Sequence, residues 1–235
     1  MRRLIVQKSG QFVIIAVLMI ALMIISIAPL LHRTVTYYKH EPWEEYLALI
    51  GSIELNSERL VTLSLANYTQ TLNQDILTEN LEKWQIDIMK IYSGRGISLT
   101  YETAYLNYSW EKQQSLSVAN VTFILDIESI GLEGYKFTVV ELLNLTIIAI
   151  DESNILVSVK DENKAPVTDL EVGNFKVIDA NTNSTIGLEQ VISDYDEKEQ
   201  LIYRLVCNCT VPTPVVVEVW SPENIHAIAK YSPQD

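Results

Sequence analysis

The spacing of hydrophobic and polar residues changes along the chain and separates three kinds of segment. Residues 12–31 form an unbroken apolar run, residues 43–91 carry apolar side chains at helical spacing, and most of the remainder alternates with a period of two. This pattern predicts an α+β protein with an N-terminal transmembrane helix, a helical hairpin, an antiparallel β-region and a C-terminal immunoglobulin-like β-sandwich. The expected segments are a cytoplasmic leader (1–11), the transmembrane helix (12–31), the hairpin (40–96), the β-region (97–150) and the sandwich (151–235).

The apolar run from Phe12 to Leu31 has 20 residues and no charged side chain, enough to cross a hydrocarbon core of about 30 Å as an α-helix. Arg2, Arg3 and Lys8 precede it, and the positive-inside tendency keeps that end in the cytoplasm. A secretory signal peptide is the alternative, but its apolar region is shorter and ends in a small-x-small site, whereas this run ends in Pro-Leu-Leu-His. The run therefore predicts a single-pass anchor in the cell membrane with an extracellular C-terminal region.

The predicted hairpin consists of two amphipathic stretches. Pro42, followed by two glutamates, favours the start of the first helix, and Gly94 and Gly96 end the second. The apolar stripe of these helices either packs within the pair or serves as a docking face for partner subunits. Self-packing is the simpler interpretation.

The alternating region predicts half-buried antiparallel strands from Ile97 onward, with a turn at Gly131 and Gly134. A last module begins near Asp151 and contains five or six short strands separated by turns about ten residues apart. Such spacing is typical of an immunoglobulin-like sandwich, although a Cys-Trp-Cys framework is missing from the sequence.

The two cysteines, Cys207 and Cys209, lie two residues apart in a predicted strand. Their Cα atoms would be about 6.6 Å apart, near the limit of disulfide geometry. We therefore expect two small buried thiols, and a strained redox pair is the alternative.

Charge is distributed unevenly. All 30 acidic residues follow His40, and from His32 onward the chain carries 14 basic side chains, a formal charge of −16. Nucleic acid is therefore not an expected partner, because phosphate binding needs a basic surface.

Six Asn-x-Ser/Thr sequons occur where composition alone predicts about two. Four of them stand at strand positions opposite in parity to the apolar residues and should face solvent. The alternative is that polar strand faces are simply rich in Asn and Thr. We predict N-glycosylation at some of these sites, which are Asn67, Asn107, Asn120, Asn144, Asn183 and Asn208.

Sequence signals for a metal or a catalytic site are weak. The segment Asp179-Ala-Asn181-Thr-Asn183 resembles the start of a calcium loop, but Ser184 replaces the required Gly and Gln190 the bidentate Glu. We expect a hairpin turn there, and a solvated acidic turn around Asp194, Asp196 and Glu197 rather than a weak calcium site.

Only three histidines are present (His32, His40 and His226), and neither a G-x-S-x-G motif nor a Gly-rich phosphate loop occurs. The expectation is therefore that the protein is not an enzyme and needs no metal or cofactor. Paired carboxylates for glycoside hydrolysis remain an alternative that spacing alone does not test.

The residues Lys8-Ser9-Gly10-Gln11, directly before the apolar run, resemble the short basic leader of archaeal type IV pilin-like proteins. The resemblance implies that a prepilin peptidase cuts between Gly10 and Gln11, so that the helix stays in the membrane or forms the core of a filament. One departure is Ile15, where many bacterial pilins have Glu. The later region is similar to archaeal membrane-anchored surface proteins, which implies an architecture but no activity; the residues that carry this similarity are Pro42 to Glu45, Phe123 to Tyr135, and Val216 to Trp220.

These observations favour a membrane-anchored extracellular structural protein, either a pilin-like subunit or a surface scaffold. Its expected partners are membrane lipid, like subunits or other surface proteins, and prepilin peptidase. The alternative is an anchored binding module, such as an adhesin or a sugar-binding receptor domain, that does not assemble into filaments.

Overall fold

The computed structural model describes residues 16–27, 43–111 and 113–232. The chain divides into two compact units, Met1–Ile50 and Gly51–Asp235. In the first unit, residues 16–27 are helical and their hydrophobic side chains are largely exposed. Among the described helices, none combines the length and the apolar character needed to span a bilayer. The predicted leader (1–11) and both ends of the predicted transmembrane helix (12–31) lie outside the described residues.

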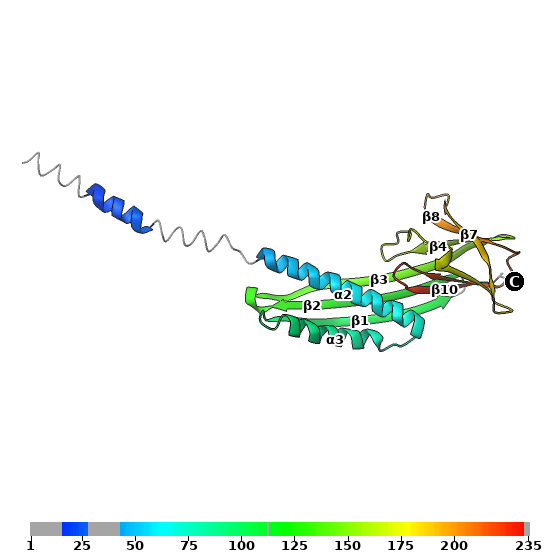
Figure 1. Ribbon diagram of the computed structural model, residues 1–235, viewed down its shortest axis with the longest axis horizontal. Coiled ribbons are helices and arrows are strands. Elements are labelled where there is room, and N and C mark those ends of the chain that lie inside the picture. The colour runs from blue at the N-terminus through cyan, green and yellow to red at the C-terminus, as the bar shows by residue number, and fades with distance from the viewer. Residues whose placement is uncertain (1–15, 28–42, 112, 233–235) are drawn as a thin grey trace, which may run out of the picture. The chain divides into compact units, whose positions relative to one another are not determined.

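Helix α2 begins in the first unit and continues into the second, which contains all the other elements (Figure 1). The helices and strands are α2 (Trp43–Thr71), α3 (Ile76–Ile91), β1 (Ile97–Glu111), β2 (Gln114–Ile127), β3 (Leu132–Ile150), β4 (Asn154–Lys160), β5 (Phe175–Asp179), β6 (Ser184–Ile186), β7 (Leu188–Tyr195), β8 (Leu201–Cys207), β9 (Val215–Trp220) and β10 (His226–Tyr231). Two short 3₁₀ helices, η1 (Glu128–Ile130) and η2 (Val172–Asn174), precede β3 and β5.

Two buried serines join α2 to α3. Trp84 Nε1 donates to Ser57 Oγ at 3.0 Å, and Asn80 Nδ2 donates to Ser64 Oγ at 3.0 Å. The partners run in opposite order along the two helices, so the helices are antiparallel. Both serines are fully buried, and their hydroxyl oxygens give the Trp84 and Asn80 N–H groups acceptors between the helices.

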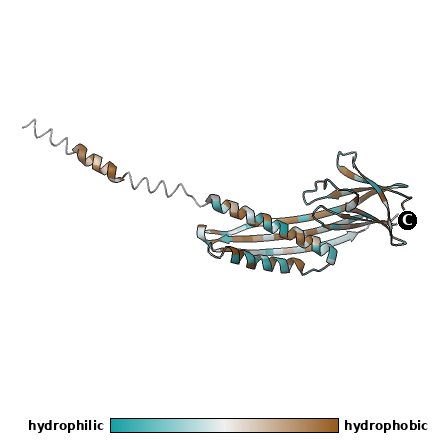
Figure 2. Ribbon diagram, in the orientation of Figure 1, coloured by the Kyte–Doolittle hydropathy of each residue, from teal (hydrophilic) through white to brown (hydrophobic). Residues whose placement is uncertain are grey.

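The larger sheet has six antiparallel strands in the order β1-β2-β3-β4-β8-β7. Along β2, buried residues alternate with half-exposed ones from Ser115 to Ile127, as expected of a sheet with one covered face. The helices lie over the covered face of β1 to β3, where Thr62 of α2 donates to Glu141 of β3 (Figure 1). Figure 2 shows hydrophobic and hydrophilic positions interspersed along these strands and helices.

The smaller sheet has the order β10-β9-β5-β6; its strand β10 packs on β1, β2 and β3, and its strand β5 meets β8. The ring centroids of Phe175 on β5 and Tyr203 on β8 are 5.7 Å apart, and Tyr203 Oη donates to the Val167 carbonyl at 2.7 Å. Buried residues from both sheets, including Leu205 and Val217, fill the space between them. The expected α+β class with antiparallel sheets is confirmed.

The larger sheet continues across residue 150, where the sequence predicts the end of the β-region. Ile147 of β3 pairs with Val157 of β4, so both predicted regions contribute to one sheet. Similarly, β3 is a single strand of 19 residues, although its pattern suggests two. Glu141 interrupts the apolar alternation at an inward-facing position and accepts a hydrogen bond from Thr62 at 2.9 Å, which explains the apparent break.

The two cysteines occupy different environments. Cys207 ends β8 and is buried, as predicted, whereas Cys209 follows the strand and is exposed. The expectation of two buried thiols is therefore wrong for Cys209, because the chain bends away once β8 ends. Burial, and secondarily Cys209, raises the pKa of the Cys207 thiol to about 11.

We expect one reactive thiol in the folded chain. Iodoacetamide should modify Cys209 and spare Cys207, because alkylation needs an accessible thiolate. Mass spectrometry should therefore count one adduct before denaturation and two after it. Cys209→Ala should abolish the native adduct, and rapid native labelling of Cys207 would contradict its burial in the sandwich.

Candidate functional site

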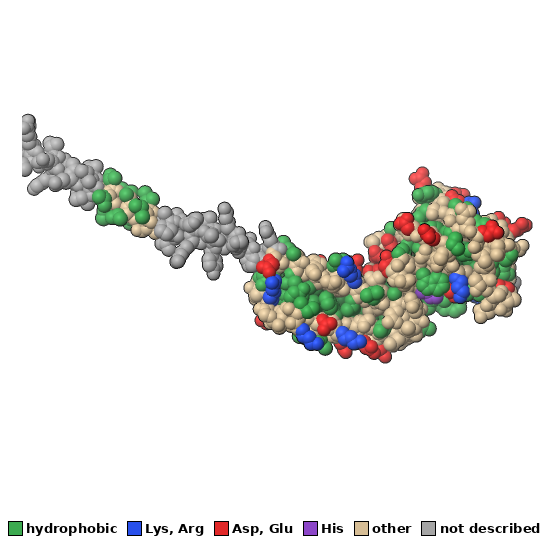
Figure 3. All heavy atoms as spheres, in the orientation of Figure 1, with side chains coloured by type: hydrophobic (Ala, Val, Ile, Leu, Met, Phe, Trp, Pro, Cys, Tyr) green, Lys and Arg blue, Asp and Glu red, His purple; other side chains and the backbone are tan. Residues whose placement is uncertain are grey.

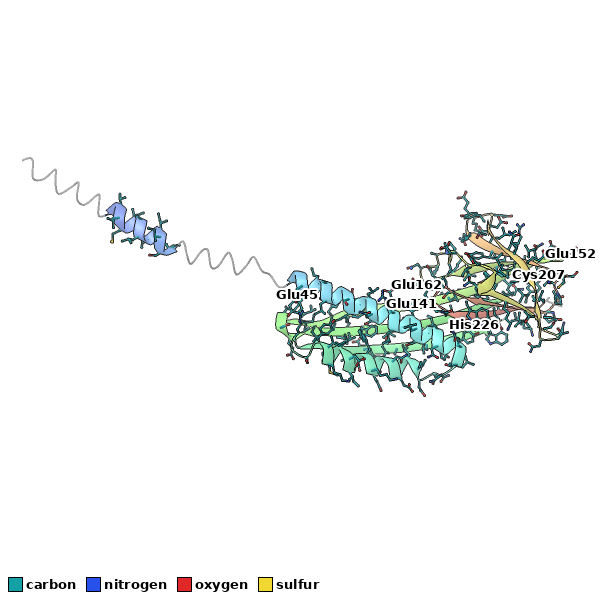
Figure 4. All side chains as sticks on the ribbon, viewed as in Figure 1. Glu45, Glu141, Glu152, Glu162, Cys207 and His226 are labelled. Atoms are coloured by element: carbon teal, nitrogen blue, oxygen red, sulfur yellow. The ribbon has the colours of Figure 1, made fainter. Side chains whose placement is uncertain are left out.

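An acidic pocket of about 610 Å³ lies where α2, β3 and the loops around residues 161–169 and 221–225 meet. Its lining contains neither Lys nor Arg. Figure 3 shows many more acidic than basic side chains on this part of the surface, and Figure 4 places Glu141 and Glu162 close together. The carboxylates in the lining are Glu58, Glu141, Asp161, Glu162, Asp169 and Glu223.

Helix periodicity and strand parity bring the inner pocket residues together. Glu58 and Thr62 are four residues apart on α2 and therefore lie on the same side of the helix. Glu141 points from β3 toward that side, where its Oε1 accepts a hydrogen bond from Thr62 Oγ1 at 2.9 Å. The hydrogen bond holds a carboxyl group at the base of a pocket whose rim is also acidic.

The pocket environment raises the pKa of Glu141 from 4.5 to about 7. Burial is the main cause, because it penalises the charged form, and the nearby carboxylates of Glu162, Glu58 and Glu223 add to it. The hydrogen bond from Thr62 opposes this rise. A substantial fraction of Glu141 is therefore protonated near neutral pH, which reduces repulsion within the pocket.

The loop that carries Asp161 and Glu162 has a defined conformation. Asp161 Oδ1 accepts hydrogen bonds from the backbone N–H groups of Asn163 and Ala165, at 2.9 and 2.8 Å. This Asx-type turn keeps the two acidic residues at the pocket rim. A concave surface lined by one sign of charge concentrates counter-ions, so the arrangement suits a positively charged ligand better than an anion.

A second polar cluster, composed of Tyr108, Lys176, Glu218, Trp220 and His226, lies where β1 meets the smaller sheet. The His226 ring stacks on Trp220 with centroids 4.5 Å apart, and its Nε2 lies 3.7 Å from Glu218 Oε2. Lys176 Nζ is 3.6 Å from the same carboxylate oxygen. Tyr108 Oη and His226 Nε2 are buried and lack a hydrogen-bond partner within the described part of the chain.

Burial determines the titration of this cluster. It lowers the pKa of His226, while Glu218 opposes the shift, and it raises the pKa of Tyr108 to about 12 with a further contribution from Glu218. Both groups are therefore held in their neutral forms at neutral pH. The distance of 3.7 Å from His226 to Glu218 is too long for a hydrogen bond, and the cluster provides no evident nucleophile.

The structure places the remaining candidates as follows. Gly10, Gln11, His32 and His40 lie outside the described residues. The predicted hairpin turn after Asp179 is confirmed, because β5 and β6 pair across it and the Asp179 carboxylate accepts hydrogen bonds from Asn181 N and Thr182 Oγ1. These bonds lower the pKa of Asp179.

The predicted acidic turn is present at Asp196 and Glu197, whereas Asp194 lies in β7 and forms an ion pair with Arg204 of β8. Asp196 Oδ1 accepts hydrogen bonds from the backbone N–H groups of Lys198 and Gln200, which lowers the pKa of its carboxyl group. Across the described ranges, no three His, Cys, Asp or Glu side chains are arranged to hold a metal ion.

Sequence reasoning missed the acidic pocket, because its carboxylates are distributed over 166 positions from Glu58 to Glu223. One local signal was available. Glu141 stands at an inward-facing position between Val139 and Leu143, where alternation calls for an apolar residue. Polar residues at such positions often mark sites rather than packing.

The six sequons are scattered over four different settings. Asn107, Asn120 and Asn144 lie half-exposed on three adjacent strands, Asn67 is exposed on α2, and Asn183 and Asn208 are exposed in a turn and a bend.

Comparison of the chain with protein-family models, with curated proteins and with solved structures found no significant match.

Proposed function

We propose that the chain is a membrane-anchored extracellular structural protein, a pilin-like subunit or surface scaffold. The observation that carries this proposal is the joining of a 20-residue charge-free apolar run to a β-rich unit with long strands. The leader 1–11 would be cytoplasmic, residues 12–31 would cross the membrane, and the rest would project outward.

The second unit has the features of a projecting spacer. Strands β1 to β3 contain 14 to 19 residues each, and a 19-residue strand extends roughly 60 Å at about 3.3 Å per residue. One face of these strands carries the two helices, and the smaller sheet packs at the end where β1 stops and β2 begins, where Ile228 N donates to Ser115 Oγ (Figure 1). We assign the predicted immunoglobulin-like sandwich to this two-sheet region, because its two antiparallel sheets are consistent with a β-sandwich.

The decisive experiment determines the mature N-terminus of protein purified from the cells that naturally make it. A chain that begins at Gln11 and resides in the membrane or in a filament fraction is the expected result. Protease added to intact cells should digest the region after His40 and spare the N-terminal side. Protection of Trp220 in intact cells would refute the outward topology.

The acidic pocket favours one alternative, an anchored binding module. Six carboxylates around about 610 Å³ suit a cationic group better than a neutral sugar. An intact N-terminus at Met1 or Arg2 in the membrane fraction, without filaments, would favour this alternative. An enzymatic role is not proposed: in the acidic pocket the Thr62 hydroxyl donates to Glu141, but the lining contains no Lys or Arg that would stabilise a developing negative charge.

A further inference from the structure

The uncovered face of β1, β2 and β3 carries three of the six sequons. Asn107 of β1 pairs with Val118, and Asn144 of β3 pairs with Leu116, so both lie close to Asn120 on the strand between them. Adjacent strands are about 4.8 Å apart and residues rise about 3.3 Å, which places the three Asn Cα atoms roughly 8–14 Å from one another. Distant sequence positions therefore form one compact group.

No protein element covers this face within the described chain, because both helices lie on the opposite one. Within β1 to β3 the positions around the three asparagines are apolar, such as Val118 and Val140, or polar and neutral, whereas the neighbour of Asn144 on β4 is the charged Lys160. Val140 is 38% exposed. A sheet face that is partly apolar and carries few charges tends to associate with other surfaces unless something covers it.

Strand geometry also places each sequon hydroxyl beside its asparagine. Residues i and i+2 share a face, and Thr146 Oγ1 donates to Asn144 Oδ1 at 3.2 Å. Thr122 and Ser109 stand in the same relation to Asn120 and Asn107. The two groups that define the glycosylation signal are thus presented together on the open face.

Asn67 shows the opposite arrangement. Its sequon hydroxyl, Thr69 Oγ1, is buried, donates to the Ala66 carbonyl at 2.9 Å and accepts the His226 backbone N–H at 3.2 Å. Asn67 itself lies within α2, where residues i and i+2 point in different directions. In the folded chain the Thr69 hydroxyl is therefore inaccessible to a modifying enzyme.

We propose that Asn107, Asn120 and Asn144 carry N-linked oligosaccharides that together cover the open face of the larger sheet, and that Asn67 carries none. The donor is an oligosaccharide activated on a lipid phosphate. Each Asn Nδ2 forms a bond to the anomeric carbon and loses one proton, while the bond from that carbon to the phosphate oxygen breaks and the lipid phosphate leaves with the electron pair. Neither oxidation nor reduction is involved.

This inference rests on the outward topology of the proposed function, because the donor lipid and its transferase act on exported chains. The full-length protein should be purified from its natural cells and digested, and the sequon peptides analysed by mass spectrometry. We expect glycan on the peptides containing Asn107, Asn120 and Asn144. Asn107→Gln, Asn120→Gln and Asn144→Gln should each remove one glycan from the intact mass, whereas Asn67→Gln should remove none.

Two outcomes would overturn the proposal. The first is that fewer than two of the peptides containing Asn107, Asn120 and Asn144 carry glycan. This includes the case in which the sheet face is unmodified and binds a second copy of the chain in a dimer. The second is glycan on Asn67. Protease treatment of the same intact cells tests the topology separately. If the chain is exported but Asn107, Asn120 and Asn144 carry no glycan, the glycosylation proposal is refuted and the proposed outward topology is not.

Discussion

Replacing Phe123 by alanine is expected to lower the free energy of unfolding by about 3–5 kcal/mol. Phe123 is 1% exposed on the helix-covered face of β2, and its ring stacks on Phe137 of β3 with centroids 5.0 Å apart. Truncation removes a buried ring and leaves a cavity that the strands and helices cannot fully close. Urea unfolding of the purified chain, monitored by tryptophan fluorescence, measures the change.

Ile124→Ala provides the matched control, because Ile124 neighbours Phe123 but points to the open face. It is half-exposed between Thr100 and Lys136, so its truncation should cost about 1 kcal/mol or less. Equal losses at the two positions would show that the covered face of β2 has been assigned incorrectly.

Replacing Glu141 by glutamine is expected to stabilise the chain at about pH 8 by roughly 1–2 kcal/mol and to have little effect near pH 4. The folded-state pKa of Glu141, about 7, lies above its ordinary value of 4.5. A raised pKa of this kind contributes stability that is fully present below about pH 4.5 and is lost as the pH rises through about 7. The full pKa shift of Glu141 would correspond to a little over 3 kcal/mol of stability. Solvent screening of the partly exposed carboxyl group reduces the expected effect to roughly 1–2 kcal/mol.

Glutamine keeps a carbonyl oxygen that can accept the Thr62 hydrogen bond. The difference between Glu141→Gln and the parent at each pH reports this carboxyl group together with its coupling to Glu58, Glu162 and Glu223, because the titrating groups that do not interact with Glu141 contribute equally to both chains. Thermal unfolding across the range from about pH 4 to 8 gives the profile. Glu189→Gln, at an exposed position on β7, should change stability by less than about 0.5 kcal/mol at every pH. A Glu141→Gln chain that is less stable than the parent at high pH would contradict the assigned environment.

Local patterns determined which elements form but not how they assemble. Helical spacing from Trp43 to Ile91 and alternation from Ile97 onward reflect which side of each element is buried, and this can be read from neighbouring residues. The inward position of Tyr203 and Leu205 on β8 followed from the same alternation. The continuity of β3 could not be predicted from this alternation, because Glu141 occupies an inward-facing position and interrupts the apolar pattern as the end of a strand would.

The candidate sites were less accessible to sequence reasoning. The acidic pocket requires α2, β3 and two loops to meet, and no local motif connects Glu58 with Glu141 or Glu223. The polar cluster around His226 likewise depends on β1 approaching the smaller sheet. Cys209 was misplaced because β8 ends two residues before it, and strand ends are set by pairing with β4 and β7 rather than by composition.

The sequence by itself determined the class of elements, the acidic charge after His40, and the parity of each strand, since these depend on side chains within a few residues of one another. It also predicted which faces of β1, β2 and β3 carry Asn107, Asn120 and Asn144. Only the tertiary structure decided that the two predicted β-regions share one sheet. It alone also decided that those three sequons form one group and that Thr69 is buried against β10, because strand order and register come from contacts between distant segments.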